Sequence, residues 1–269
     1  MRLETIASGS SGNCTYIGTE HTHMLIDAGV SMKRIAEGLH QLGLDFADLD
    51  AVFVTHEHTD HIQGIPMVEK HHGLPLYASA GTLGGIEKIM GSERFADLPV
   101  HSIRQGEETV VGDLVVRPFP IPHDAAEPFG FVVKTTGGED VRKVAYATDL
   151  GHYDDGIVRE LSGANALVLE SNHDIRMLQA GPYPWHLKKR ILGDCGHLSN
   201  DDAGRLLTDI LHDHLTGILL AHLSEVNNLP ELAYEAARVE IELSDTPYHG
   251  EDFRLQVAPR SELSEILEF

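Results

Sequence analysis

Three histidines and a carboxylate lie within six residues of one another, directly after an apolar run. They are His56, His58, Asp60 and His61, and the apolar run at residues 51–54 is typical of a buried strand. Because His56 and His58 are two residues apart, an extended backbone would direct both imidazoles to the same side. Imidazole nitrogens and carboxylate oxygens suit divalent ions such as zinc, manganese or iron. We interpret the stretch as a metal-binding loop, and the alternative is a solvated polar loop.

Three later apolar segments also run into a histidine or an aspartate. These residues are His123, Asp149 and His222. Either histidine alone would more often be structural or exposed, because histidine serves many roles. Together with the loop at residues 56–61, the recurrence of a strand followed by a ligand residue favours metal binding over those structural roles.

The elements that must position these residues alternate between strands and helices, which predicts an αβ fold. We expect an opening β-meander around the Gly/Ser loop at 8–13, and a helix capped by Thr59 or Asp60. No linker or low-complexity run divides the sequence, so a single domain over residues 1–269 is predicted. Further helices are predicted over residues 31–42 with Ser31 as the N-cap, 79–90, 184–192, 197–212 with Ser199 and Asp202 at capping-box spacing, and 230–239. Further strands are predicted over residues 75–78, as a pair near Val100 and over 110–119, and over 129–134, 143–149, 166–170, 217–222 and 253–257.

The composition constrains the partners. With 42 acidic and 20 basic residues the formal net charge is -22, so most of the surface should repel nucleic acid. A phosphate-bearing substrate therefore needs a local exception, which bound divalent metals and the basic cluster at residues 188–190 would supply. No signal sequence or membrane-spanning run is present, so we expect a cytoplasmic protein without a membrane partner. Cys14 and Cys195 are too few for a disulfide framework, and both are expected as buried thiols.

The pattern His-x-His-x-Asp-His, followed by a His, an Asp and a His at strand ends, resembles the metallo-β-lactamase superfamily over nearly the whole chain. The resemblance implies an α+β fold, an αββα four-layer sandwich with a two-metal site at one edge. The ions would be zinc or manganese, with iron as a further candidate. On that pattern one metal is held by His56, His58 and His123, the other by Asp60, His61 and His222, and Asp149 bridges the two.

A narrower resemblance rests on the segments at residues 7–14, 123–125, 170–174, 187–191, 196–200 and 222–228. They are similar to the YycJ/WalJ group of bacterial proteins. That likeness implies a dinuclear metal-dependent phosphodiesterase, a 5′-to-3′ exonuclease acting on DNA rather than RNA. Two metals can share a water and lower its pKa, so a bridging hydroxide would be the nucleophile. Asp60 would hold that water and could pass a proton to the leaving group.

Four residues outside the ligand set are candidates for substrate chemistry. His197 is a candidate catalytic residue, because a histidine ahead of a capped helix can offer donors to a phosphate. Ser199, Asn172 and Arg190 are candidate substrate-binding residues. A helix cap would equally explain Ser199, a loop contact Asn172, and a salt bridge Arg190.

Two other functions fit the same ligands. One is hydrolysis of a lactone, thioester or β-lactam, since metal ligands do not choose the electrophile. The other is a non-catalytic metal-bearing regulatory protein, against which the complete ligand set argues. The sequence leaves the oligomeric state open, a dimer included.

Overall fold

The computed structural model describes residues 1–137 and 140–269. The chain divides into two compact units. Unit 1 comprises Met1–Pro120, Ala125–Val141 and Pro259–Glu268, and unit 2 comprises Ile121–Asp124, Arg142–Ala258 and Phe269. The single domain expected over residues 1–269 stays a prediction.

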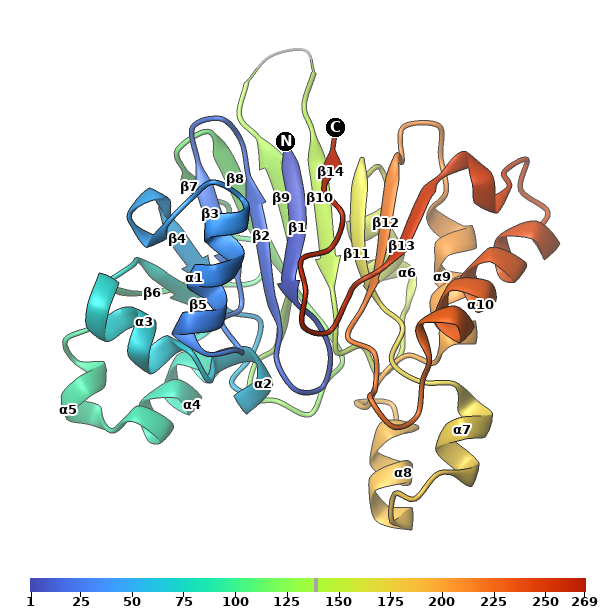
Figure 1. The fold of residues 1–269 in the computed structure, drawn as a ribbon, viewed down its shortest axis with the longest axis horizontal. Coiled ribbons are helices and arrows are strands. Elements are labelled where there is room, and N and C mark those ends of the chain that lie inside the picture. Colours follow the sequence, from blue (N-terminus) through green and yellow to red (C-terminus); the bar gives the residue numbers. More distant parts are fainter. Residues whose placement is uncertain (138–139) are drawn as a thin grey trace. The chain divides into compact units, whose positions relative to one another are not determined.

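Unit 1 is built on a mixed sheet with the strand order β14-β1-β2-β3-β4-β5-β6 among the described residues (Figure 1). β1, β2 and β3 pair antiparallel and form the predicted meander, whereas β3 to β6 pair in parallel. The short β14, which the sequence did not predict, pairs with β1. The bounds are β1 Arg2–Ala7, β2 Cys14–Gly18, β3 His23–Ile26, β4 Ala51–Phe53, β5 Leu76–Ala78, β6 Val100–Ser102 and β14 Leu267–Glu268.

A three-stranded antiparallel ribbon completes the strands of unit 1. It consists of β7 (Thr109–Val111), β8 (Leu114–Pro120) and β9 (Phe129–Thr135). The predicted pairing of the segment near Val100 with residues 110–119 is wrong. β6 pairs with β5, and β8 pairs with β7 across a turn at Gly112, whose φ of 55° suits glycine.

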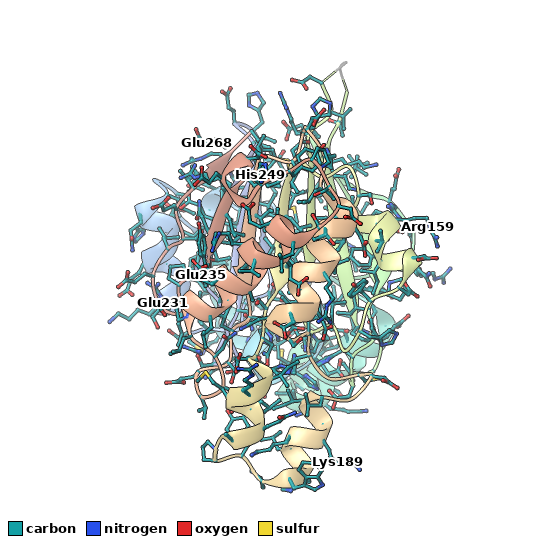
Figure 2. All side chains as sticks on the ribbon, turned by 90° about the vertical axis from the view of Figure 1, so that its right-hand side faces the viewer. Arg159, Lys189, Glu231, Glu235, His249 and Glu268 are labelled. Carbon is teal, nitrogen blue, oxygen red and sulfur yellow. The ribbon has the colours of Figure 1, made fainter. Side chains whose placement is uncertain are left out.

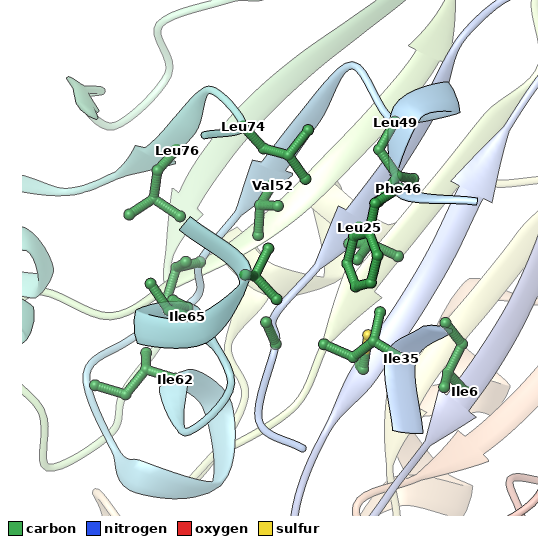
Figure 3. Packing of buried hydrophobic residues seen from close by; sticks show 14 of the residues in the cluster. Ile6, Leu25, Ile35, Phe46, Leu49, Val52, Ile62, Ile65, Leu74 and Leu76 are labelled. Carbon is green, nitrogen blue, oxygen red and sulfur yellow. The ribbon is translucent and has the colours of Figure 1, made fainter. Parts of the chain in front are cut away.

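Helices cover one face of the unit 1 sheet and bury its apolar side chains. Figure 3 shows Ile35 of α1 and Ile65 of α3 directed toward Leu25 and Val52 on strands β3 and β4. Each fully buried side chain of this kind contributes about 1.5–3 kcal/mol, so this packing holds strands β3 and β4 against the helices. The helix bounds are α1 Met32–Gln41, α2 Thr59–Ile62, α3 Ile65–His72, α4 Ala80–Met90 and α5 Ser92–Phe95, with a 3-10 turn at Phe46–Asp48.

Two helix starts follow the sequence prediction and one does not. Ser31 and Ser79 cap α1 and α4 with their side chains, as serine hydroxyls do at N-caps. The predicted cap at Thr59 or Asp60 is wrong, because His58 is the N-cap of α2 and makes no side-chain cap bond. The helix also breaks before α3, where Gly64 N donates to the carbonyl of Ala28 at 2.7 Å.

Unit 2 contains four parallel strands in the order β13-β12-β11-β10, with β13 at the predicted edge. The helices α9 and α10 pack against one another beside β12 and β13 (Figure 1). Parallel strands end at the same edge of a sheet, so residues that follow β10, β11 and β12 are brought together. The bounds are β10 Lys143–Ala147, β11 Ala166–Glu170, β12 Gly217–Ala221, β13 Arg254–Val257, α6 Asp155–Leu161, α7 Ile175–Ala180, α8 Trp185–Ile191, α9 Asn200–Ile210 and α10 Pro230–Leu243, with a 3-10 turn at Gly250–Asp252.

The cysteines differ in their surroundings. Cys14 is buried in β2, as predicted, whereas Cys195 is exposed after α8, so the prediction of a buried thiol there is wrong. Across residues 1–137 and 140–269, no helix combines the length and the apolar character that crossing a membrane requires.

Candidate metal centre

The loop after β4 brings the four predicted ligands of unit 1 together. His56 Nε2 and His58 Nδ1 lie 3.0 Å apart, and the rings of His56 and His61 have centroids 4.1 Å apart. His61 Nε2 is 3.5 Å from a carboxylate oxygen of Asp60. Strand β4 ends at Phe53, before the first histidine, so the loop that follows can bring these side chains together, as the spacing of the ligand residues predicted.

Asp27 orients the histidines of this loop, a role that the sequence analysis missed. Its carboxylate accepts hydrogen bonds from the Thr55 backbone N–H (2.8 Å) and hydroxyl (3.0 Å), and lies 2.7 Å from His61 Nδ1. Burial raises the pKa of Asp27, while His61 and Thr55 act to lower it. With Nδ1 of His61 held by Asp27, Nε2 is the nitrogen directed to a ligand position.

Backbone hydrogen bonds from the Gly/Ser loop and from the turn after β3 fix the main chain at Asp60 and His61. Asn13 N donates to the carbonyl of Asp60 at 2.8 Å, and Ala28 N donates to that of His61 at 2.9 Å. A Cβ atom at Gly29 would lie 1.6 Å from the carbonyl oxygen of Asp60. Only glycine therefore permits this approach of two backbone segments.

In unit 2, four side chains converge at the carboxyl ends of the parallel strands. Asp149, Glu170, His197 and His222 each offer a ligand atom, and these atoms all lie within 4.8 Å of one another. Asp149 Oδ1 is 3.5 Å from His222 Nδ1 and 3.6 Å from His197 Nδ1. The sheet thus brings together the predicted residues Asp149 and His222, and His197 beside them.

Glu170 organises this cluster, and the sequence analysis gave it no role. Its Oε1 atom lies 2.8 Å from Nδ1 of both His197 and His222, while Oε2 accepts from the backbone N–H of Leu150 and Leu198. Burial acts to raise the pKa of Glu170, but the two histidines outweigh it and bring the pKa to about 2. An ionised carboxylate only accepts, so both histidines donate from Nδ1 and direct Nε2 away from Glu170.

His123 lies beside the same cluster in unit 2. Its Nδ1 is 3.2 Å from the carbonyl of Gly196, and its ring centroid is 5.1 Å from that of His197. Its Nε2 lies 3.8 Å from Asp149 Oδ1. The contact with a backbone carbonyl again fixes which nitrogen faces the carboxylates.

The three predicted substrate-binding residues have structural partners in unit 2. Asn172 is buried and its amide donates to the carbonyl of His222 at 2.9 Å, and Ser199 is the predicted N-cap of α9. Arg190 forms a two-point ion pair with Asp124 and is half exposed. Their contacts with a substrate stay predictions.

Left-handed backbone marks three of the strand ends described above. Among the described residues other than glycine, φ is positive at Asp27 (63°), Asp149 (63°) and His222 (58°). Such conformations are uncommon outside glycine, cost of order 1–3 kcal/mol and cluster at functional sites. Each turns the chain sharply at a strand end, so the side chain faces its cluster.

The donor chemistry of both units suits divalent metal ions. Each unit offers imidazole nitrogens fixed by a carboxylate or a backbone oxygen, together with an aspartate in the same cluster. Histidine ligands of metals are typically oriented by such hydrogen bonds. The set therefore fits divalent metal ions such as zinc, manganese or iron.

Comparison with known proteins gives the family and the fold. Residues 22–220 match the family model described as "Beta-lactamase superfamily domain". Exodeoxyribonuclease YycJ of Bacillus anthracis is 40% identical over 87% of this chain and 86% of its own length. Exodeoxyribonuclease WalJ of Streptococcus pneumoniae is 34% identical over 95% of this chain and 93% of its own.

A solved structure supports the same assignment of the fold. Zinc-bound PqqB from Methylobacterium extorquens aligns over the full length of both chains with a TM-score of 0.70 at 17% identity. The predicted fold class is therefore confirmed: the chain is an α+β protein with the metallo-β-lactamase fold.

Proposed function

The chain belongs to the beta-lactamase superfamily and, within it, to the YycJ/WalJ group of metal-dependent hydrolases, and from this premise we propose that it is a dinuclear phosphodiesterase that degrades DNA. The observation that carries the proposal is the pair of Glu170 and His197. Cleavage of a phosphodiester needs a proton for the departing oxygen. The pair provides a positioned donor beside the proposed ligands Asp149 and His222.

We propose that the donor sets of the two units act on one pair of metal ions. One ion would be held by His56, His58 and His123, the other by Asp60, His61 and His222, with Asp149 shared. When bound, such ions supply Lewis acidity and an activated water at neutral pH. Zinc or manganese suits the nitrogen and oxygen donors, and iron is a further candidate.

Two residues of the chain, His197 and Asp60, would donate and accept the protons of the reaction. Glu170 holds Nδ1 of His197, so Nε2 is the atom that would give a proton to the leaving oxygen. Asp60, a quarter of whose side chain is exposed, would accept the proton of the attacking water.

DNA, rather than RNA, is the proposed substrate, with digestion from the 5′ end. The two relatives are both named exodeoxyribonucleases and match this chain over most of its length. The net charge of -22 disfavours broad contact with a long duplex, which supports action at an end. The cytoplasmic location also stays a prediction.

Digestion of end-labelled oligonucleotides tests this function. Manganese- or zinc-loaded protein is incubated with 5′- and 3′-labelled DNA and RNA, and products are resolved nucleotide by nucleotide. We expect stepwise shortening of DNA from the 5′ end, abolished in Asp60→Ala and His61→Ala. His71→Ala, which removes an exposed histidine from α3, is the matched control and should digest normally.

His197→Ala separates proton donation from metal binding. Loss of a general acid lowers the rate by about 10²- to 10⁴-fold, while both metal equivalents should remain bound. His222→Ala should instead lose metal. If metal-loaded protein left every oligonucleotide intact but opened lactones or thioesters, the phosphodiesterase proposal would be wrong.

A further inference from the structure

A basic hairpin extends from the strand ends of unit 2. It comprises residues 175–193, that is α7, α8 and their connection, and is called the basic hairpin below (Figure 1). It carries four Lys or Arg residues and no Asp or Glu, although acids outnumber bases 42 to 20 in the chain. Figure 2 shows Lys189 at its tip, away from Glu231 and Glu235 on α10. The hairpin is thus a local exception to the acidic charge of the chain.

An exposed tryptophan lies among these bases. Trp185 is 71% exposed and is the single tryptophan of the chain. Trp185 and Lys189 are four residues apart on α8, so they share a face of the helix, and His186 and Arg190 share the adjacent one. The exposed indole ring offers a flat face on which another aromatic ring can stack.

Lys188 holds the two helices of the basic hairpin together, while the side chains of Lys189 and Arg176 stay exposed. Lys188 is nearly buried, and its Nζ donates to the carbonyls of Gln179 and Gly181 at 2.7 Å each. These oxygens end α7, so Lys188 fixes α8 against α7. Among the described residues, neither Lys189 nor Arg176 makes an ion pair, so both charges face solvent.

The base of the hairpin adjoins the catalytic candidates of unit 2. Arg190 pairs with Asp124, the neighbour of His123, at 2.9 Å between Nη2 and Oδ1. The segment after α8 leads directly to Gly196, whose carbonyl contacts His123, and to His197. An extended polymer bound along the hairpin would therefore reach His197 at its base.

We propose that the basic hairpin binds single-stranded nucleic acid, with a base stacked on Trp185 and a neighbouring phosphate on Lys189. The inference rests on the proposed function and names the form of its substrate. Proteins that bind single-stranded nucleic acid without sequence preference combine aromatic side chains, on which nucleobases stack, with Lys and Arg side chains that contact the phosphates. Stacking of this kind requires an unpaired nucleobase. The remaining acidic surface repels polyanions, so contact is confined to this short segment.

The intrinsic fluorescence of Trp185 reports this surface alone. Manganese-loaded full-length protein is titrated with a phosphorothioate oligothymidine, whose linkages resist hydrolysis, and with a blunt duplex of the same length. We expect saturable quenching by the single strand and much weaker quenching by the duplex. Equal quenching by poly-glutamate or by anionic vesicles would overturn the proposal, because neither offers a base to stack.

Variants test the two contacts separately through the anisotropy of a dye-labelled oligothymidine. Trp185→Ala should weaken binding about fivefold to a hundredfold, and Trp185→Phe should restore part of the loss. Lys189→Ala should lower the slope of log affinity against log salt by about 0.7, the value for one phosphate on a single strand. Arg159→Ala, which removes an exposed base from α6, should bind like the wild type.

Failure of this inference is distinguishable from failure of the proposed function. If the wild type digests DNA but Trp185→Ala binds the oligonucleotide unchanged, the hairpin is not the binding surface. If the wild type binds through Trp185 yet digests no oligonucleotide, the hairpin inference stands and the nuclease proposal fails. Equal circular dichroism spectra and melting temperatures would show that each variant is folded.

Discussion

At the scale of single residues, one carboxylate oxygen organises two histidines. Oε1 of Glu170 accepts from both His197 and His222, and the side chain is fully buried. A buried acceptor that satisfies two donors fixes both tautomers at once. The chemistry of a proton donor and the orientation of a metal ligand therefore depend on one atom.

Glu170→Gln tests this shared dependence. The neutral amide no longer presents a charge to His197 and His222, and its NH₂ group cannot accept a hydrogen bond. We expect metal affinity to fall about 10- to 100-fold, as for other residues that orient metal ligands. A metal titration checks this, with Glu231→Gln on α10 as the exposed control. Unchanged affinity and an unchanged pH profile of activity would contradict the role of Glu170.

Glu69 of α3 predicts a pH dependence of stability. It is 5% exposed, neither carboxylate oxygen has a hydrogen-bond partner, and burial raises its pKa to about 7. The folded state therefore holds a proton that the unfolded state releases above about pH 4.5, so stability falls as the pH rises from about 4.5 to 7.

Glu69→Gln should remove this dependence. The variant should gain about 2 kcal/mol over the wild type above pH 7, and nothing below about pH 4.5. Urea unfolding at pH 4.5 and pH 8 measures both differences. A variant no more stable than the wild type at pH 8 would show that the Glu69 carboxylate is solvated.

The predicted ligands and the residues that orient them differ in how far sequence reveals them. Histidines at a spacing of two and ligand residues at strand ends are visible in the sequence, because they are local patterns. Asp27 and Glu170 are not, since each orients histidines that lie at least 27 residues away in the sequence. Both do follow or end a strand, the one signal that could have found them.

At the scale of elements, close approach of two backbones decides where the histidine loop lies. Gly29 N donates to the carbonyl of Asn13 at 2.7 Å, and Asn13 N donates to that of Asp60. The turn after β3, the Gly/Ser loop and α2 are thus joined through main-chain groups. The position of the histidine loop therefore depends on Gly29, a residue without a side chain.

Gly29→Ala should therefore impair metal binding by the histidine loop. Its Cβ would lie 1.6 Å from Asp60 O and 2.8 Å from Asn13 N, so the backbone must shift. We expect a loss of at least 2 kcal/mol of stability, roughly as for overpacking of a core, and weaker metal binding. Gly84→Ala in α4 meets nothing within 4 Å and should be neutral or slightly stabilising. Thermal unfolding and a metal titration compare the two.

Element boundaries were predictable where a side chain makes the boundary. Ser31, Ser79 and Ser199 cap their helices as their types predict. The break between α2 and α3 depends instead on the hydrogen bond from Gly64 to Ala28. Two-residue β14 has no pattern to read, because its pairing with β1 is a contact between chain ends.

At the scale of the whole molecule, self-repulsion of the acidic surface sets the response to salt. A net charge of -22 destabilises the folded chain at low ionic strength, and salt screens that repulsion within about 10 Å at 0.1 M. We expect the melting temperature of the metal-loaded protein to rise between 10 and 300 mM NaCl, measured by calorimetry at pH 7.5. Potassium fluoride should give the same rise, since screening depends on ionic strength and not on the ion. Binding of the oligothymidine should weaken over the same range, because it is attraction that salt screens at the basic hairpin. A melting temperature that falls with salt would show that attractive pairs, and not the excess of acids, dominate the surface.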